Sequence, residues 1–324
     1  MSTGIAALVC YAGVFNDVIG VEEIASRLGV AGRAEFYAAV DELHRQERIV
    51  VKDGFAGLPN FEDKIAAKVS KIAFTKKLIS SRMEQLRKIG RNPLVKFVGI
   101  SGSLAADNPT RDINGRLDLD VFLITKRHCL WIYRTIMGIR GLFPRSKAEP
   151  ELCINYIIDE SNLTVTIRNF YTATEIRNLI PVAQLELHRK FLQANDWACY
   201  YYPGMSDTSA PPPLALPENL IDKLFYFTFI ALRCVKWFSF EPLRKLSFKS
   251  DPHTGESPCM SRPPYGGYHA LVQKKFSRLA ALWFPELLNA ELIKEMFPDE
   301  LSTELRKGDV DVASLLALDY SKYG

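Results

Sequence analysis

The sequence predicts a mixed α/β core that is preceded by a small helical domain and followed by a helical region. Short apolar strand segments alternate with helical segments in residues 93–183, three helical segments and a hairpin pattern fill residues 1–60, and helical periodicity dominates residues 184–324. The 324 residues are 48% hydrophobic and 24% charged. Such a chain can bury a sizeable core, and its composition excludes disordered, collagen-like and coiled-coil proteins.

Three helices and a hairpin are predicted in residues 1–60. The first helix starts near Ile5, the second covers 21–28 and ends at a glycine, and the third covers 33–46. Residues 49–58 alternate around an Asp-Gly turn, as in a hairpin. This order resembles a winged helix-turn-helix, in which the third helix enters the DNA major groove. Because that helix carries acids as well as basic residues here, DNA binding, protein docking and a structural role all stay open.

A long basic helix is predicted over residues 61–92, between the N-terminal domain and the core. Apolar residues at helical spacing form its inner face, and the lysines form its outer face. The inner face comprises Ile65, Val69, Ile72, Ile79, Met83 and Leu86. Residues 61–96 hold ten lysine or arginine residues against three acids, although the whole chain has a net charge of only +4. This density predicts either a solvated helix face or a surface for nucleic acid.

The core is predicted to contain four strands and a crossover helix. The strands cover 95–100, 118–124, 152–158 and 163–167, and the helix covers 128–141. A helix that connects two neighbouring strands makes them parallel, so the second and third strands are expected to begin side by side. The tight turn that follows the third strand is expected to fold the fourth strand back antiparallel.

Two carboxylates open the second of these strands. Asp118 and Asp120 are two residues apart and therefore project from one face of the strand, while Leu119 and Val121 face the core. Adjacent carboxylates repel each other unless a cation neutralises them, and their oxygens suit a hard divalent ion such as Mg²⁺ or Mn²⁺. The spacing predicts a metal site at the start of this strand.

A glycine-serine pair follows the first strand of the core. Gly102 and Ser103 stand where strand 95–100 ends and a short helix can begin. Glycine lets a phosphate approach the backbone, and exposed amides with the serine hydroxyl suit phosphate oxygens. A phosphate cradle beside a pair of metal-binding carboxylates is typical of phosphoryl and nucleotidyl transfer.

The succession of strand, Gly-Ser, gap and Asp-x-Asp resembles the nucleotidyltransferase superfamily typified by DNA polymerase beta, tRNA CCA-adding enzymes and aminoglycoside nucleotidyltransferases. The resemblance covers residues 93–183. Fourteen residues separate the serine from the first aspartate, slightly more than is usual in the family. The resemblance implies that Gly102 and Ser103 contact a nucleoside triphosphate and that Asp118 and Asp120 bind the metals.

The superfamily also uses a third carboxylate on a neighbouring strand. Glu151 precedes strand 152–158 and is expected beside Asp118, because parallel strands begin at the same edge of a sheet. Asn155, inside that strand, is the alternative occupant, and it would leave the site without a third acid. Arg168, which the fourth strand is expected to return toward Glu151, is predicted either to bind the triphosphate or to pair with an acid.

The pattern predicts a metal-dependent nucleotidyltransferase that transfers a nucleoside monophosphate from a triphosphate to an acceptor and releases pyrophosphate. The alternative is a regulator in which a winged helix binds DNA or a partner and an inactive nucleotidyltransferase-like domain senses nucleotide. Loss of the third carboxylate would favour the regulator. Residues 184–324 contain no readable acceptor motif, and the proline-rich segment 203–217 within them is predicted to be a loop.

Cysteine spacing and hydropathy predict a cytoplasmic protein with reduced thiols and no membrane contact. The six cysteines have no spacing typical of a zinc site or a disulfide framework. No basic residue precedes the apolar N-terminal segment, so a signal peptide is not expected. The most hydrophobic later segment, 224–240, is interrupted by Arg233 and Lys236 and is too short for a bilayer span.

Overall fold

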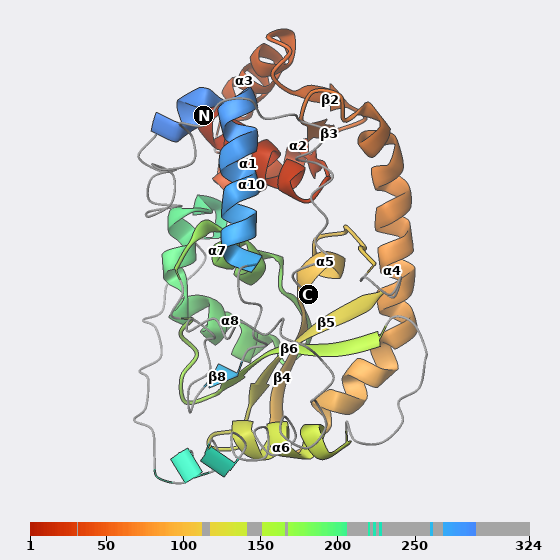
Figure 1. The fold of residues 1–324 in the computed structure, drawn as a ribbon, viewed down its shortest axis with the longest axis vertical. Helices are drawn as coiled ribbons and strands as arrows, with labels where there is room; N and C mark the ends of the chain where they lie inside the picture. The colour runs from red at the N-terminus through yellow and green to blue at the C-terminus, as the bar shows by residue number, and fades with distance from the viewer. Residues whose placement is uncertain are drawn as a thin grey trace, which may run out of the picture.

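The structure is a computed structural model, and its fold is mixed α/β, as the sequence predicts. Figure 1 shows the N-terminal helices at one end of the molecule, the larger sheet toward the other end, and the long helix α4 (Glu62–Gly90) along one side. The structure describes residues 1–30, 32–111, 117–140, 151–165, 168–205, 220, 223–224, 227–228, 260–261 and 268–289.

Residues 1–60, hereafter the N-terminal unit, form three helices and a small antiparallel sheet. The predicted helices and hairpin form at their expected places, and a further short strand, β1, joins the hairpin to give the order β1-β3-β2. Gly29 ends the second helix with φ +62°, a conformation that glycine adopts without strain. The elements are α1 Ser2–Val14, β1 Ile19–Gly20, α2 Val21–Leu28, α3 Arg33–Arg45, β2 Val50–Lys52 and β3 Phe55–Gly57.

Helix α4 forms where the sequence predicts it, but two predictions about its faces are wrong. Val69, expected inside, is 60% exposed, whereas Lys68, expected outside, is only 5% exposed. Lys68 is buried because its ammonium group lies 2.5 Å from the carboxylate of Asp17, which is also 5% exposed. Ile65 and Leu86 are buried, as expected.

The larger sheet has five strands in the order β7-β4-β5-β6-β8. β5 and β6 are parallel, which confirms the crossover predicted through α6 (Leu130–Arg140). β4 is antiparallel to β5 and β7, and β8 is antiparallel to β6. The sequence pattern predicts neither β7 nor β8. The strands are β4 Val95–Ile100, β5 Asp118–Thr125, β6 Glu151–Asp159, β7 Ile180–Ala183 and β8 Met260–Ser261.

The predicted strand 163–167 is wrong over residues 163–165, and residues 166–167 lie outside the described part of the chain. The buried side chain of Asn195 binds this segment instead. Its Oδ1 accepts the N–H of Val165 at 2.7 Å, and its Nδ2 donates to the carbonyl of Leu163 at 2.8 Å. These bonds satisfy backbone groups that a neighbouring strand would otherwise satisfy.

Different elements cover the two faces of the larger sheet. On one face, Leu119 packs in a cluster with Trp131 of α6 and Leu86 of α4. On the other face, the ring of Phe122 lies 5.0 Å from that of Phe191 in α8 (Leu185–Ala194). Because side chains alternate along a strand, the even-numbered residues at the start of β5 share the face of Phe122.

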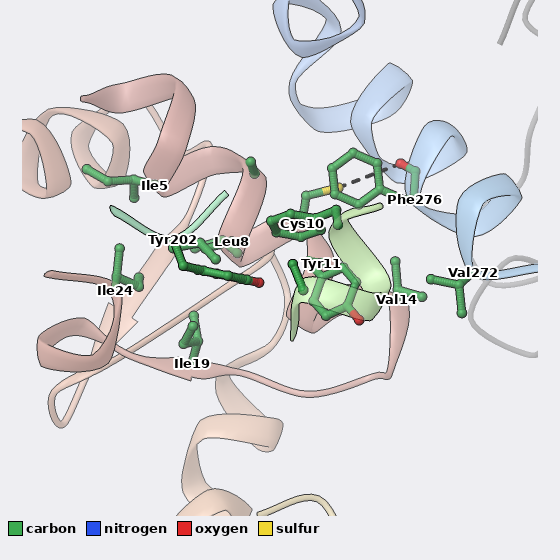
Figure 2. Close-up of a cluster of buried hydrophobic side chains, with 14 of the residues drawn as sticks. Ile5, Leu8, Cys10, Tyr11, Val14, Ile19, Ile24, Tyr202, Val272 and Phe276 are labelled. Atoms are coloured by element: carbon green, nitrogen blue, oxygen red, sulfur yellow. Dashed lines mark hydrogen bonds between the residues drawn. The ribbon is translucent and has the colours of Figure 1, made fainter. Parts of the chain in front are cut away.

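The helix α10 (Tyr268–Trp283) packs on α1 and closes the core of the N-terminal unit. Figure 2 shows Val272 and Phe276 of α10 among the side chains of α1, where the thiol of Cys10 donates to the carbonyl of Phe276 at 3.7 Å. Tyr202 belongs to the same buried cluster. One continuous hydrophobic core therefore links α1, one face of the larger sheet and α10.

Short 3₁₀ helices connect the remaining described elements. Part of the predicted loop 203–217 forms one of them, and residues 206–217 lie outside the described part of the chain, as do residues 290–324. The 3₁₀ helices are η1 Asp196–Tyr200, η2 Pro203–Met205 and η3 Pro285–Asn289. None of the helices that the structure describes is long and apolar enough to cross a membrane. The four cysteines in the described ranges form no disulfide bond: Cys10, Cys129, Cys153 and Cys199.

Candidate functional site

The two predicted metal ligands open β5 and share one face of the sheet. Asp118 and Asp120 are half-buried, while Leu119 and Val121 are completely buried on the opposite face. This alternation is the one predicted from the sequence. The backbone carbonyl of Asp120 also accepts the N–H of Ser101 at 2.9 Å, which fixes the end of β4 beside the start of β5.

The glycine of the Gly-Ser pair lies directly against the Asp120 carboxylate. β4 ends at Ile100 and the short helix α5 spans Gly102–Ala105, so strand, turn and helix follow one another as predicted. Gly102 has φ +68°, and a Cβ atom at this position would overlap Oδ2 of Asp120. Only glycine combines this backbone conformation with this close approach.

A third carboxylate reaches the site from helix α7 (Phe170–Asn178), and the sequence reasoning missed it. Oε2 of Glu175 accepts the N–H of Gly102 at 3.3 Å. The charge of Glu175 also acts on Asp120. Burial, followed by the negative charges of Glu175 and Asp118, raises the pKa of Asp120 to about 7. We refer to Asp118, Asp120 and Glu175, with the Gly102 amide, as the carboxylate site.

One weak signal for Glu175 exists in the sequence. Glu175 stands between Thr174 and Ile176, both of which are buried in α7. A charged residue flanked by buried residues suggests an internal partner. Nothing local shows that α7 lies beside α5, so the signal does not name that partner.

The neighbouring strand β6 brings the predicted third acid to the expected register. Glu151 pairs with Asp118 along the parallel ladder, as the topology predicts. Cys153, not an acid, pairs with Asp120. Asn155, the alternative occupant, lies where the register between β5 and β6 shifts, so it is in register with neither aspartate.

Arg168 lies on an exposed segment directly before α7. The antiparallel strand that was expected to return it toward Glu151 is absent over residues 163–165. Asn169, the next residue, caps α7 by accepting the N–H of Thr172 at 2.8 Å. The role of Arg168 in triphosphate binding depended on that strand and stays a prediction.

The donor chemistry of the site fits magnesium or manganese. Burial and then the repulsion from Glu175 and Asp118 raise the pKa of Asp120, and a divalent cation would neutralise these carboxylates. Oγ of Ser101 is buried beside the site and has no hydrogen-bond partner among the described residues. In the described ranges, no group of three or more His, Cys, Asp and Glu side chains is arranged to hold a metal. Mg²⁺, however, keeps several waters and is commonly held by one or two carboxylates together with substrate phosphates.

The structure thus brings together Gly102, Asp118 and Asp120, which the sequence predicts, and adds Glu175. Gly102 and Ser103 are half-buried at the junction of β4 and α5. In comparisons with known proteins, no family model, no curated protein and no solved structure matches this chain.

Proposed function

We propose that this protein is a metal-dependent nucleotidyltransferase. The observation that carries the proposal is the crowding around Asp120: its carboxylate lies against Gly102, Glu175 accepts the N–H of Gly102, and the charges of Glu175 and Asp118 both act on Asp120. The order of strand, Gly-Ser, short helix and Asp-x-Asp strand supports it. This order places backbone suited to phosphate oxygens beside carboxylates suited to metal ions.

Each residue of the site has its own role in nucleotide binding. Asp118 and Asp120 would hold magnesium or manganese, and Gly102 and Ser103 would face the triphosphate. When bound, the ion neutralises phosphate charge and favours ionisation of the attacking group. Glu175 serves as the third carboxylate, and its hydrogen bond to Gly102 holds α5 against α7.

The reaction breaks a phosphoanhydride bond of the triphosphate and forms a new bond between the acceptor oxygen and phosphorus. The acceptor oxygen forms a bond to the α-phosphorus of the nucleoside triphosphate and loses its proton. The bond between the α-phosphorus and the oxygen that bridges to the β-phosphorus breaks, and pyrophosphate leaves with that oxygen.

Incubation of the full chain with each nucleoside triphosphate and Mg²⁺ or Mn²⁺, followed by pyrophosphate release, tests the proposal. Release that requires the metal and is lost in Asp118→Ala supports transfer. Metal-dependent nucleotide binding without release under any acceptor condition favours the alternative, a nucleotide-sensing regulator. Absence of nucleotide binding contradicts both functions.

Glu175→Gln is expected to lower the rate of pyrophosphate release by about 100-fold, the upper range for loss of a group that supports a metal site. Glutamine keeps the length of the side chain but removes the charge that acts on Asp120. Glu151→Gln, the matched change at the acid predicted from the sequence, is expected to cost less than about tenfold. The reverse order of effects would assign the third carboxylate to β6 instead of α7.

Gly102→Ala is expected to reduce pyrophosphate release by roughly 100-fold, because the new methyl group displaces the Asp120 carboxylate. Gly54→Ala is the matched control. Gly54 also has a positive φ, +78°, but a Cβ atom there meets nothing within 4 Å. Both variants therefore carry the same kind of backbone strain, and only Gly102→Ala disturbs the site. Equal activity of the two variants would contradict the placement of Gly102 against Asp120.

We also propose that duplex DNA contacts the outer face of α4 and not α3. The three helices and three-stranded sheet of the N-terminal unit support the winged-helix assignment, but the basic residues of α3 have acidic neighbours. Arg33 lies 4.0 Å from Glu22, and Arg45 pairs with Glu42. The later half of α4 instead exposes Lys76, Lys77, Arg87 and Lys88.

Charge reversal at Lys76, Lys77 and Arg87 is expected to weaken binding of duplex DNA and to flatten its salt dependence. Each lost phosphate contact makes the negative slope of log K against log salt concentration shallower by about 0.9. The control variant reverses the charges of Arg33 and Arg45 on α3, and we expect it to change the slope little. If only the α3 variant loses binding in a fluorescence titration, the DNA contact belongs to α3.

A further inference from the structure

The turn that follows α5 is held by α4 and by the loop between α1 and β1. Asn108 donates from Nδ2 to the carbonyl of Phe15 at 3.1 Å and accepts from Nζ of Lys71 at 2.8 Å. Its own N–H donates to the carbonyl of Ser103 at 3.0 Å. Lys71 also lies 3.3 Å from Asp17. The segment from Ser103 to Asn108 is therefore tied to the N-terminal unit through Asn108.

A buried ion pair strengthens this connection. Nζ of Lys68 lies 2.5 Å from Oδ2 of Asp17 and also donates to the carbonyls of Asp107, at 3.2 Å, and Ala106, at 3.4 Å. These two carbonyls follow α5 directly. Because one ammonium group binds the N-terminal unit and both carbonyls, the turn cannot move without breaking partly buried charge-assisted hydrogen bonds.

Helix α7, which carries Glu175, is held by the same N-terminal unit at a second point. Nη2 of Arg27, on α2, donates to Oδ1 of Asn178 at 2.8 Å. The Arg27 guanidinium also lies over the ring of Tyr202, 5.3 Å from its centroid. The Tyr202 hydroxyl is in turn 2.5 Å from the hydroxyl of Thr174. Arg27 therefore anchors α7 on both sides of Glu175 in the sequence.

We propose that the N-terminal unit positions the two walls of the carboxylate site, which are α5 with the turn that follows it and α7. Lys71 and Arg27 are then positioning residues. The hydrogen bond between Gly102 and Glu175 joins α5 to α7. Each of these helices is fixed separately to the N-terminal unit, so this unit sets their relative position. The consequence for nucleotide binding rests on the proposed function, whereas the consequence for the geometry of the walls does not.

Hydrogen exchange of the full chain without nucleotide tests the geometry. In Lys71→Met, the amides of residues 102–108 are expected to exchange roughly tenfold faster, and in Arg27→Met the same holds for residues 170–178. Arg48→Met is the matched control, because Arg48 joins the N-terminal unit to Glu286 of η3 and stacks over Phe284. It is expected to change neither segment. Unchanged exchange in both Lys71→Met and Arg27→Met overturns the proposal.

Kinetics then separate positioning from a general loss of folded protein. Lys71→Met is expected to raise the KM for the nucleoside triphosphate about fivefold, since misplaced binding groups weaken substrate binding. Lys71→Arg, which keeps the charge, is expected to keep the KM of the wild type. A lower kcat at unchanged KM in Lys71→Met, with no rescue by arginine, contradicts positioning. If wild-type protein neither binds nor turns over nucleotide, the proposed function fails, and the exchange result still decides whether the N-terminal unit positions these walls.

Discussion

Asp120→Asn is expected to slow nucleotidyl transfer severely and, at the same time, to make the protein more stable at pH 8. Asparagine keeps the shape of the side chain but removes a carboxylate that is crowded by Asp118 and Glu175. Loss of this charge-stabilising group should lower the rate of pyrophosphate release by about 1,000-fold. The variant no longer buries this negative charge or suffers its repulsion from the other two carboxylates. Its free energy of unfolding should therefore be higher by about 1–3 kcal/mol.

The gain in stability from Asp120→Asn depends on pH. The pKa of Asp120 is raised from 3.8 to about 7 in the folded protein, so the folded state holds more protons than the unfolded state between these values. The free energy of unfolding of the wild type therefore falls as pH rises from about 4 to about 7, and the variant lacks this component. Urea unfolding at pH 5 and pH 8 measures the difference.

Asp63→Asn is the control for this experiment. Asp63 is exposed, and its hydrogen bond with Lys64 lowers its pKa, so its removal should not stabilise the protein at pH 8. A stability gain in Asp120→Asn that is the same at pH 5 and pH 8 would contradict the crowding of Asp120. A fully active Asp120→Asn protein would contradict its role in catalysis.

Lys68→Met is expected to lower the free energy of unfolding by about 3 kcal/mol, because it leaves the buried carboxylate of Asp17 without its nearest cation. The same change releases the carbonyls of Ala106 and Asp107. Urea unfolding at neutral pH measures the loss. The large effect follows from burial, since both members of the pair are only 5% exposed.

A double-mutant cycle isolates the pair. When Asp17→Asn is combined with Lys68→Met, the unpaired charge disappears, so the double variant should lose less stability than the sum of the single variants. Lys64→Met breaks the exposed pair with Asp63 and is expected to cost about 0–1 kcal/mol. Additive effects of the two changes at the buried pair would show that Asp17 and Lys68 do not stabilise each other.

The parts of the fold that the sequence predicts depend on local patterns or on general rules of topology. The alternation after Asp118 identifies β5, and the crossover rule makes β6 parallel to it. Together they place Glu151 in register with Asp118. Helix α4 follows from its periodicity in the same way.

The parts that the sequence does not predict depend on contacts between distant segments. Periodicity assigns Lys68 to the surface because it does not reveal the buried carboxylate of Asp17. Glu175 joins the site because α7 packs beside α5, which no local pattern shows. β7 contains Pro181, which argues against a strand, and the strand forms because it lies at the edge of the sheet, where proline is tolerated.

The position of the transferred label tests the central claim most directly. The full chain is incubated with Mg²⁺ and nucleoside triphosphates labelled either at the α- or at the γ-phosphate, with added RNA or protein as acceptor. For a nucleotidyltransferase, we expect the α-label to become covalently attached to the acceptor, the γ-label to appear in pyrophosphate, and both signals to vanish in Asp118→Ala. Transfer of the γ-label to the acceptor, or release of inorganic phosphate in place of pyrophosphate, would contradict nucleotidyl transfer.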